Sequence, residues 1–336
     1  MLGVFLALCS AATFALNNTF ARRGVLTGSA VQALSISVPI GVPMFFLGAL
    51  VTSSLGWLFE FSLRSCIFLA LAGIVHFVWG RYCNYRSVKA IGSNLAGPLQ
   101  ESSVLIALAL AVVVLGEAIT PLKAVGIFLV LMGPALAVQI GKKKALAPSK
   151  ETNPDNKPKP AFQPLYAEGY LFAGLSALGY GTSPILVRAA LEEASPGASL
   201  AGGLISYGAA SLVVLIVIIA SGQIVDVRKM SASNAKWFGA AGLMVGLSQM
   251  LRYLALSMAP VSVVAPIQRL SLLFRMLFSW LFNREHEVFS ARLLGGTLVS
   301  LLGALLLSVS TDVIAQLLPL PEWLLRIAAM SWSFGG

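Results

Sequence analysis

Long apolar runs limit the possible folds of this chain more strongly than any other feature of its sequence. Several runs reach about 18 residues or more, the length with which an α-helix crosses a hydrocarbon core of about 30 Å. The runs lack the period-two alternation of barrel strands, and a membrane span must satisfy its own backbone hydrogen bonds. Only 11 % of the residues are charged, against roughly 25 % in soluble domains. The sequence therefore predicts an all-α integral membrane protein.

Ten transmembrane helices are predicted from windows of about 19 residues. They lie near residues 2–20, 31–52, 66–89, 94–115, 121–140, 168–190, 199–221, 237–258, 262–283 and 291–310.

Two other segments divide the chain into parts. Residues 141–165 are rich in Lys, Pro and Asn and predict a flexible polar linker between a first five-helix unit at 1–140 and a second at 166–310. Residues 311–336 contain two prolines and two tryptophans, which predict a broken amphipathic C-terminal segment lying at the membrane interface.

The two units repeat one another. The matching stretches are 3–22 with 169–188, 85–117 with 253–285 and 126–133 with 296–303, at offsets of 166, 168 and 170 residues. Glycines seven residues apart in the last pair recur on one helix face and suit close helix packing. Because five spans per unit is an odd number, two copies joined by a loop must lie in opposite orientations. Such inverted repeats are typical of secondary transporters, whose substrate sites lie near the midplane between the halves.

Three local motifs accompany the repeat: Tyr85, Lys89 and Pro98 across the third and fourth spans, Leu115-Gly116-Glu117 closing the fourth, and the glycine-spaced fifth span. In order and duplication they resemble the EamA-type ten-helix members of the drug/metabolite transporter superfamily, over both units. The resemblance implies export or exchange of amino acids, related metabolites or drugs without ATP hydrolysis. It also implies a central cavity lined by spans three, four, eight and nine. The stretch 283–287, Asn-Arg-Glu-His-Glu, is more charged than is usual in that family.

Polar side chains within the spans mark a candidate substrate site, because a charge at the bilayer centre costs several kcal/mol (about 2.5–3.5 on insertion scales). Arg81, Asn84 and Tyr85 share one helix face, and their repeat mates share another, so we expect both units to direct a polar face to one cavity. The candidate substrate-binding residues are His76, Trp79, Arg81, Asn84, Tyr85, Gln100, Glu101, Gln249, Arg252, Tyr253, Gln268 and Arg269.

Several of these residues have alternative roles. Glu101 and Arg269 are repeat mates of opposite charge, which could pair with each other or bind the amine and carboxylate of a zwitterion separately. Glu101 is also the candidate proton carrier for coupling. Arg81 and Arg86 could instead extend to lipid headgroups. His76 could be a hydrogen-bonded structural residue, and Pro98 and Pro266 are expected to kink or start their helices.

The charges within the spans favour an anionic substrate. Five arginines stand against Glu101 there, at positions 81, 86, 252, 269 and 275. Such a cavity should attract anions, so the sequence predicts a transporter of a small carboxylate-bearing metabolite such as an amino acid, with Arg252 and Arg269 as carboxylate ligands. Exchange of a nucleotide sugar or phosphate ester is the alternative, since arginines bind phosphates as well.

Other functions fit the sequence less well. The net charge of +10 lies in loops, the linker and the spans rather than on one soluble surface, so no nucleic-acid partner is expected. With His76 and His286 as its histidines, three unpaired cysteines and scattered carboxylates, the chain is expected to be no enzyme and to need no metal or cofactor. The expected partners are a small-molecule substrate, the lipid bilayer, and protons or a counter-substrate, for a monomer or homodimer in a bacterial inner membrane.

Overall fold

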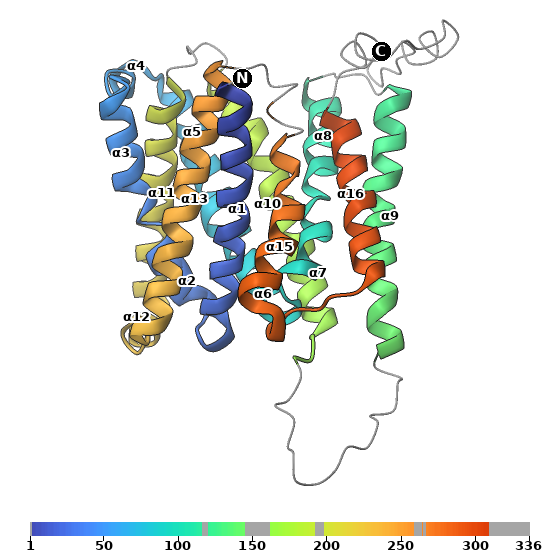
Figure 1. The fold of residues 1–336 in the computed structure, drawn as a ribbon. Helices are drawn as coiled ribbons and strands as arrows, with labels where there is room; N and C mark the ends of the chain where they lie inside the picture. Colours follow the sequence, from blue (N-terminus) through green and yellow to red (C-terminus); the bar gives the residue numbers. More distant parts are fainter. Residues whose placement is uncertain are drawn as a thin grey trace, which may run out of the picture.

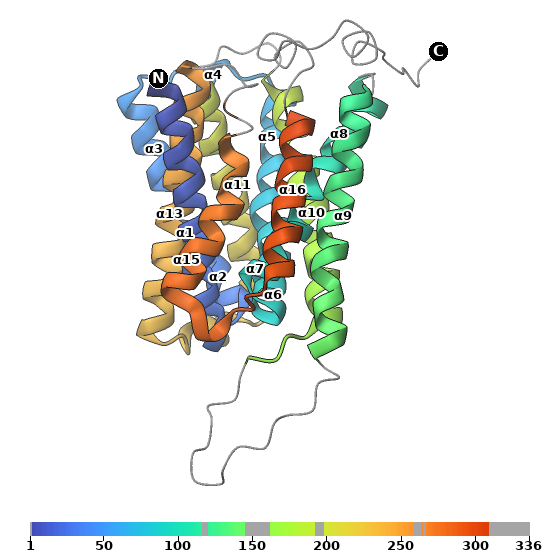
Figure 2. The same cartoon turned by 45° about the vertical axis from the view of Figure 1, so that its right-hand side comes forward.

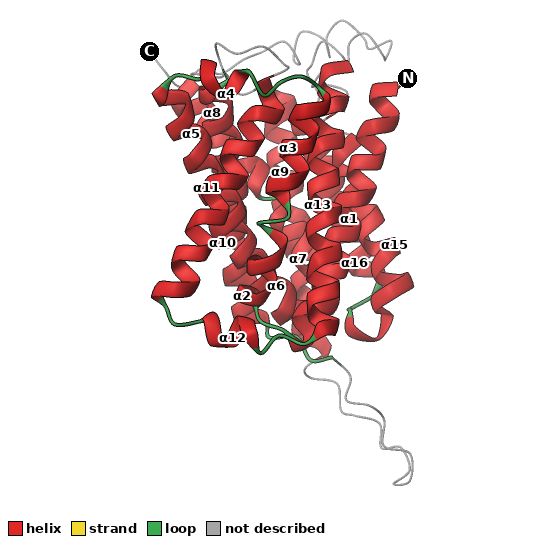
Figure 3. Ribbon diagram, turned by 90° about the vertical axis from the view of Figure 1, so that its left-hand side faces the viewer, coloured by secondary structure: helices red, strands yellow, loops and turns green. Residues whose placement is uncertain are grey.

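The described part of the chain is built from helices joined by short connections, as the apolar runs predict (Figure 1 and Figure 3). The computed structural model describes residues 2–115, 120–144, 162–191, 198–258, 264 and 267–308. The predicted segment at 311–336, most of the predicted linker, Glu117 and Pro266 lie outside these residues.

The helices follow the predicted spans in order. In the first unit they are α1 (Leu2–Thr27), α2 (Ala30–Ser37), α3 (Gly41–Val51), α4 (Trp57–Glu60), α5 (Leu63–Gly73), the π-helix η1 (Ile74–Gly80), α6 (Arg81–Ile91), α7 (Ser93–Gln100), α8 (Ser103–Leu115) and α9 (Pro121–Lys144). In the second they are α10 (Tyr166–Ala190), α11 (Ala198–Ala220), α12 (Ile224–Arg228), α13 (Ala232–Met258), α15 (Ser271–Asn283), the 3₁₀ turn η2 (Arg284–His286) and α16 (Ala291–Ser308).

Among the described residues, five helical stretches are long and apolar enough to cross a membrane. They are Leu2–Thr27, Ala30–Val51, Leu63–Ile91, Tyr166–Ala190 and Ala198–Ala220. Shorter apolar helices cover Pro121–Leu136 and Ala291–Leu307. The chain is thus an integral membrane protein, while the count of ten spans stays a prediction.

In the first unit, three of the predicted spans are not single α-helices. The second is divided between α2 and α3, where Pro39 and Pro43 supply no backbone N–H to a helical ladder. The third contains η1 between α5 and α6. The fourth is divided at Glu101 and Ser102, just after Pro98 in the last turn of α7. Hydropathy windows average over these breaks and so could not reveal them.

The two units pack mainly against each other. The first helix of each unit packs on the third span of the other, α1 along α13 and α10 along α6. In the same reciprocal way α1 contacts α15 and α10 contacts α8. The last helices, α9 and α16, lie side by side (Figure 1 and Figure 2). Helix α1 begins at the upper end of the bundle and α10 at the lower end (Figure 1), which we call the linker end because α9 finishes there.

Glycines bring α9 and α16 into close contact, as their spacing predicts. A Cβ added to Gly303 would lie 2.6 Å from the backbone nitrogen of Val130 and 2.8 Å from the oxygen of Gly126. A Cβ on Gly133 would overlap the side chain of Ser300. Only glycine permits these backbones to approach so closely.

We expect Gly303→Ala to lower the thermal stability of the detergent-purified protein, because overpacking at such a contact costs about 1–3 kcal/mol. Gly295 provides a matched control on the same helix, since nothing lies within 4 Å of a Cβ added there. Gly295→Ala should leave the unfolding temperature unchanged or slightly raised. Equal unfolding temperatures for the two variants would contradict the proposed contact.

Candidate functional site

A cavity of about 290 Å³ lies between the two units, beside the break that separates α7 from α8. Its lining residues come from α1 (Ser10, Ala11, Phe14), η1 (His76), the α7–α8 region (Gln100, Glu101, Ser103, Val104, Ala107), α10 (Tyr180, Pro184), α13 (Ser248, Gln249, Arg252) and the α15 region (Gln268, Arg269, Ser271, Arg275). Both units therefore contribute walls to one site, and within the described ranges no three His, Cys, Asp or Glu side chains gather as a metal-binding group.

The structure brings part of the predicted site together in this cavity. The predicted residues that line it are His76, Gln100, Glu101, Gln249, Arg252, Gln268 and Arg269. Trp79, Arg81, Asn84 and Tyr85 are not among the lining residues. The side chain of Tyr253 lies outside the described part of the structure.

Glu101 and Arg269 form an ion pair across the boundary between the units. Oε2 of Glu101 lies 3.2 Å from Nη1 of Arg269, and the two side chains are 12 % and 29 % exposed. Of the two arrangements that the sequence allows, the structure shows the direct pair. Both residues line the cavity.

Arg275 joins the cavity wall to a chain of polar side chains behind it. Its Nη1 donates to Oε1 of Gln100 at 3.1 Å, and the Gln100 amide donates in turn to Oδ1 of Asn84. The amide of Asn84 then reaches Oδ1 of Asn18 on α1 at 3.4 Å. Asn84 thus lies behind Gln100 rather than in the lining, and it orients a residue that does line the cavity.

The rest of the predicted polar face on α6 packs against α2 and α11. Arg81 is 4 % exposed, and its guanidinium donates to the backbone oxygen of Ser37 at 3.2 Å and to the Tyr207 hydroxyl at 3.4 Å. The Tyr85 hydroxyl lies 2.8 Å from Oγ of Ser37. Arg81 is therefore buried within the bundle and does not extend to headgroups, whereas Arg86 is partly exposed and pairs with Glu168 at 2.6 Å.

The π-helix η1 explains why the predicted polar face of α6 does not line the cavity, whereas the corresponding face of α13 does. A π turn accommodates one residue more than an α turn, and one residue rotates the face that follows by about 100°. Helix α13 has no such turn and directs Ser248, Gln249 and Arg252 into the cavity. From η1 itself, His76 enters the lining and packs against Tyr180 with ring centroids 4.6 Å apart. Trp79 is 51 % exposed on the outer surface.

The prediction of the site from charged and large polar side chains did not include the small polar residues that line the cavity. Ser10 on α1 and Ser248 on α13 exchange hydrogen bonds, each hydroxyl donating to the other's backbone oxygen at 2.8 Å. The Gln268 amide donates to Oγ of Ser10 at 3.1 Å. The repeat contained a signal for such positions, because Ser103 and Ser271 are mates at the offset of 168 and both line the cavity.

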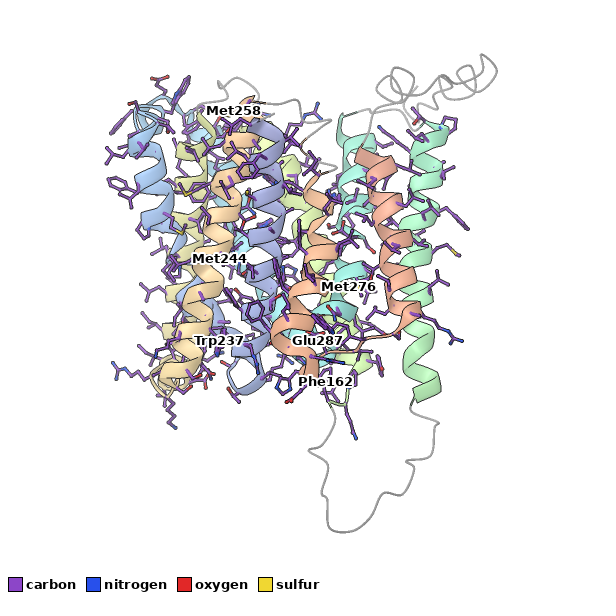
Figure 4. All side chains as sticks on the ribbon, in the orientation of Figure 1. Phe162, Trp237, Met244, Met258, Met276 and Glu287 are labelled. Atoms are coloured by element: carbon purple, nitrogen blue, oxygen red, sulfur yellow. The ribbon has the colours of Figure 1, made fainter. Side chains whose placement is uncertain are left out.

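A second polar cluster lies at the linker end of the bundle. Arg22 and Glu287 are both fully buried, and Nε of Arg22 lies 3.5 Å from Oε1 of Glu287. Figure 4 labels Glu287 and Phe162 at this end of the molecule. The Arg22 guanidinium also donates to the backbone oxygens of Val88 at 2.7 Å and of His286 at 2.5 Å. One side chain of α1 thereby ties the end of α6 to the α15–α16 connection.

Glu287 completes this cluster by capping α7. Its two carboxylate oxygens accept the backbone N–H groups of Ser93 at 2.7 Å and of Asn94 at 3.1 Å, where the N-terminal dipole favours a negative charge. Gly92 precedes them with φ +84, and a Cβ there would lie 2.5 Å from Oε2 of Glu287. Glu287 belongs to the charged stretch 283–287 and lies between Glu285 and Gly296, where the second repeat is two residues longer than the first.

We expect Glu287→Gln to lower the thermal stability of the purified protein markedly. Removing one partner of a buried ion pair costs about 3–5 kcal/mol, because the other charge stays buried without compensation. Glu285 lies two residues away and is exposed, so Glu285→Gln is the matched control and should change little. An unfolding temperature for Glu287→Gln equal to that of the control would show that the pair contributes no stability.

Comparisons with known proteins agree with this architecture. A solved structure, described as "Crystal structure of protein", matches with a TM-score of 0.55 and 16 % sequence identity, over 95 % of this chain and 98 % of that one. At that identity the likeness shows the fold alone. No curated protein matches the chain. The model of the EamA-like transporter family matches residues 1–139 and 167–309, which are the two repeated units. The chain therefore belongs to the EamA-like transporter family, and it is a membrane transporter of the drug/metabolite transporter superfamily.

Proposed function

We propose that this protein is a secondary transporter, an exporter or exchanger, of a small carboxylate-bearing metabolite such as an amino acid. One observation carries the proposal: three arginines, Arg252, Arg269 and Arg275, and a single carboxylate, Glu101, are among the residues that line the cavity between the units. Guanidinium groups bind carboxylates through paired N–H donors, and a partly desolvated site strengthens that attraction.

The size of the cavity supports a small substrate. Ligand pockets in proteins are commonly about 300–1000 Å³, and this cavity, at about 290 Å³, is at the lower limit. A compound of amino-acid size fits that space more readily than a nucleotide sugar does. We therefore keep nucleotide-sugar exchange as the less favoured alternative.

Alternating access is the proposed mechanism. The reciprocal packing of α1 on α13 and of α10 on α6 supports an inverted repeat in which each unit moves against the other. Arg22 and Glu287 join α1 to the α15–α16 connection at the linker end, and in this proposal they separate when the cavity opens there. Glu101, held by Arg269, is the candidate proton carrier. A bacterial inner membrane is the proposed location.

We expect Arg252→Ala and Arg269→Ala each to reduce substrate uptake into proteoliposomes at least about 10-fold, because each removes charge-assisted hydrogen bonds worth about 1.5–3 kcal/mol. Arg292 is exposed on α16, outside the cavity, so Arg292→Ala is the matched control and should transport normally. The substrate for this assay is selected first by a thermal-shift screen of amino acids, organic acids and nucleotide sugars. Full transport by both cavity variants would refute the assignment.

A further inference from the structure

Arg275 is a buried cation of the cavity that forms no direct ion pair with a carboxylate of the described residues. It is 4 % exposed and lines the cavity. Its guanidinium donates hydrogen bonds to uncharged groups, to Oε1 of Gln100 at 3.1 Å and to the backbone oxygen of Ser93 at 3.5 Å. Within the described part of the chain no carboxylate lies within ion-pair distance of it, and its Nε has no hydrogen-bond partner. A buried charge without a counter-charge is costly in a low-dielectric site.

Glu101 and Glu287 act on Arg275 only from beyond ion-pair distance, because each is paired with another arginine, Glu101 with Arg269 and Glu287 with Arg22. The Glu101 carboxylate pairs with Arg269 at 3.2 Å. Counted over the lining residues, three arginines and one glutamate give the cavity a formal charge of two positive units. A zwitterionic amino acid brings no net charge and leaves this excess in place, whereas a substrate with two negative charges removes it.

The guanidinium of Arg275 is also held in place before any substrate arrives. Gln100 fixes one of its nitrogens, and Gln100 is itself held by Asn84. Gly97 on α7 leaves room for it, since a Cβ there would lie 3.1 Å from Nη1 of Arg275. A fixed donor loses little conformational freedom when it binds an anion, which favours a ligand site over a mobile surface charge.

We infer that the transported substrate is a small dianion, a dicarboxylate or a phosphomonoester, and that Arg275 binds one of its two anionic charges. This inference rests on the proposed function: a dicarboxylate narrows its substrate class, and a phosphomonoester replaces the carboxylate by another small anion with two negative charges. Arg275 then determines specificity. With Arg275 the site prefers a substrate that carries two negative charges, and without it the site accepts a substrate that carries one.

The first test uses the full-length wild-type protein in proteoliposomes. Uptake is compared for succinate, for glycerol 3-phosphate, for the monoanion butyrate and for the zwitterion alanine. We expect one of the two dianions to be carried at least about 10-fold faster than alanine and butyrate, and which one it is distinguishes dicarboxylate from phosphate chemistry. Faster transport of alanine or butyrate would overturn the inference and leave the proposed function standing. Transport of none of the four, with uptake of an uncharged or cationic compound, would refute both.

The second test measures the ratio of dianion to monoanion affinity in Arg275→Gln and Arg275→Lys. We expect Arg275→Gln to lower this ratio about 10–100-fold, the range for loss of a hydrogen bond to a charged group, and Arg275→Lys to restore part of it. Arg292→Gln is the control and should keep the wild-type ratio. A purely structural role for Arg275 would weaken both ligands equally, so an unchanged ratio in Arg275→Gln overturns the inference. Should neither variant purify as a monodisperse species, the wild-type selectivity decides alone.

Discussion

The cost of burying a positive charge organises much of this molecule. A guanidinium removed from water is tolerated only where carbonyl oxygens, aromatic faces or carboxylates surround it. Arg22 meets this requirement through three kinds of partner: backbone oxygens, the Glu287 carboxylate, and the ring of Phe162 at 4.2 Å. Arg81 meets it with a carbonyl oxygen and the rings of Phe77 and Tyr207. These contacts join helices from distant parts of the sequence. The interactions that compensate the buried charges therefore also hold the bundle together.

The duplication explains the arrangement of the cavity. Repeat mates occupy it in pairs, Gln100 with Gln268 and Ser103 with Ser271, as a two-fold arrangement of the units would require. At the next position the copies have diverged to opposite charges, Glu101 and Arg269. These two repeat mates form an ion pair within the site.

Hydropathy and repetition predicted the helical membrane fold, the two units, close packing at the glycines of the fifth and tenth spans, and several lining residues, but not that α9 and α16 pack on each other. They could not place Arg81 and Tyr85, because the register of their helix depends on η1 and nothing in the sequence 74–80 marks a π turn. They also gave Glu287 no particular role, since its importance comes from a long-range contact with α7. Polar residues were recognised as buried from their place in apolar runs, but which neighbour each faces is a property of tertiary packing.

The position of Glu287 has a thermodynamic consequence for transport. If the two halves were identical, the two end states of the proposed transport cycle would be related by two-fold symmetry. They would then have equal free energy. Between Glu117 and Gly126 the first repeat has no further carboxylate, so the contact of Glu287 with Arg22 lacks a sequence counterpart at the other end of the bundle. Under the alternating access proposed above, this unmatched contact favours the conformation in which Arg22 and Glu287 are paired, and substrate binding supplies the free energy that reverses the preference.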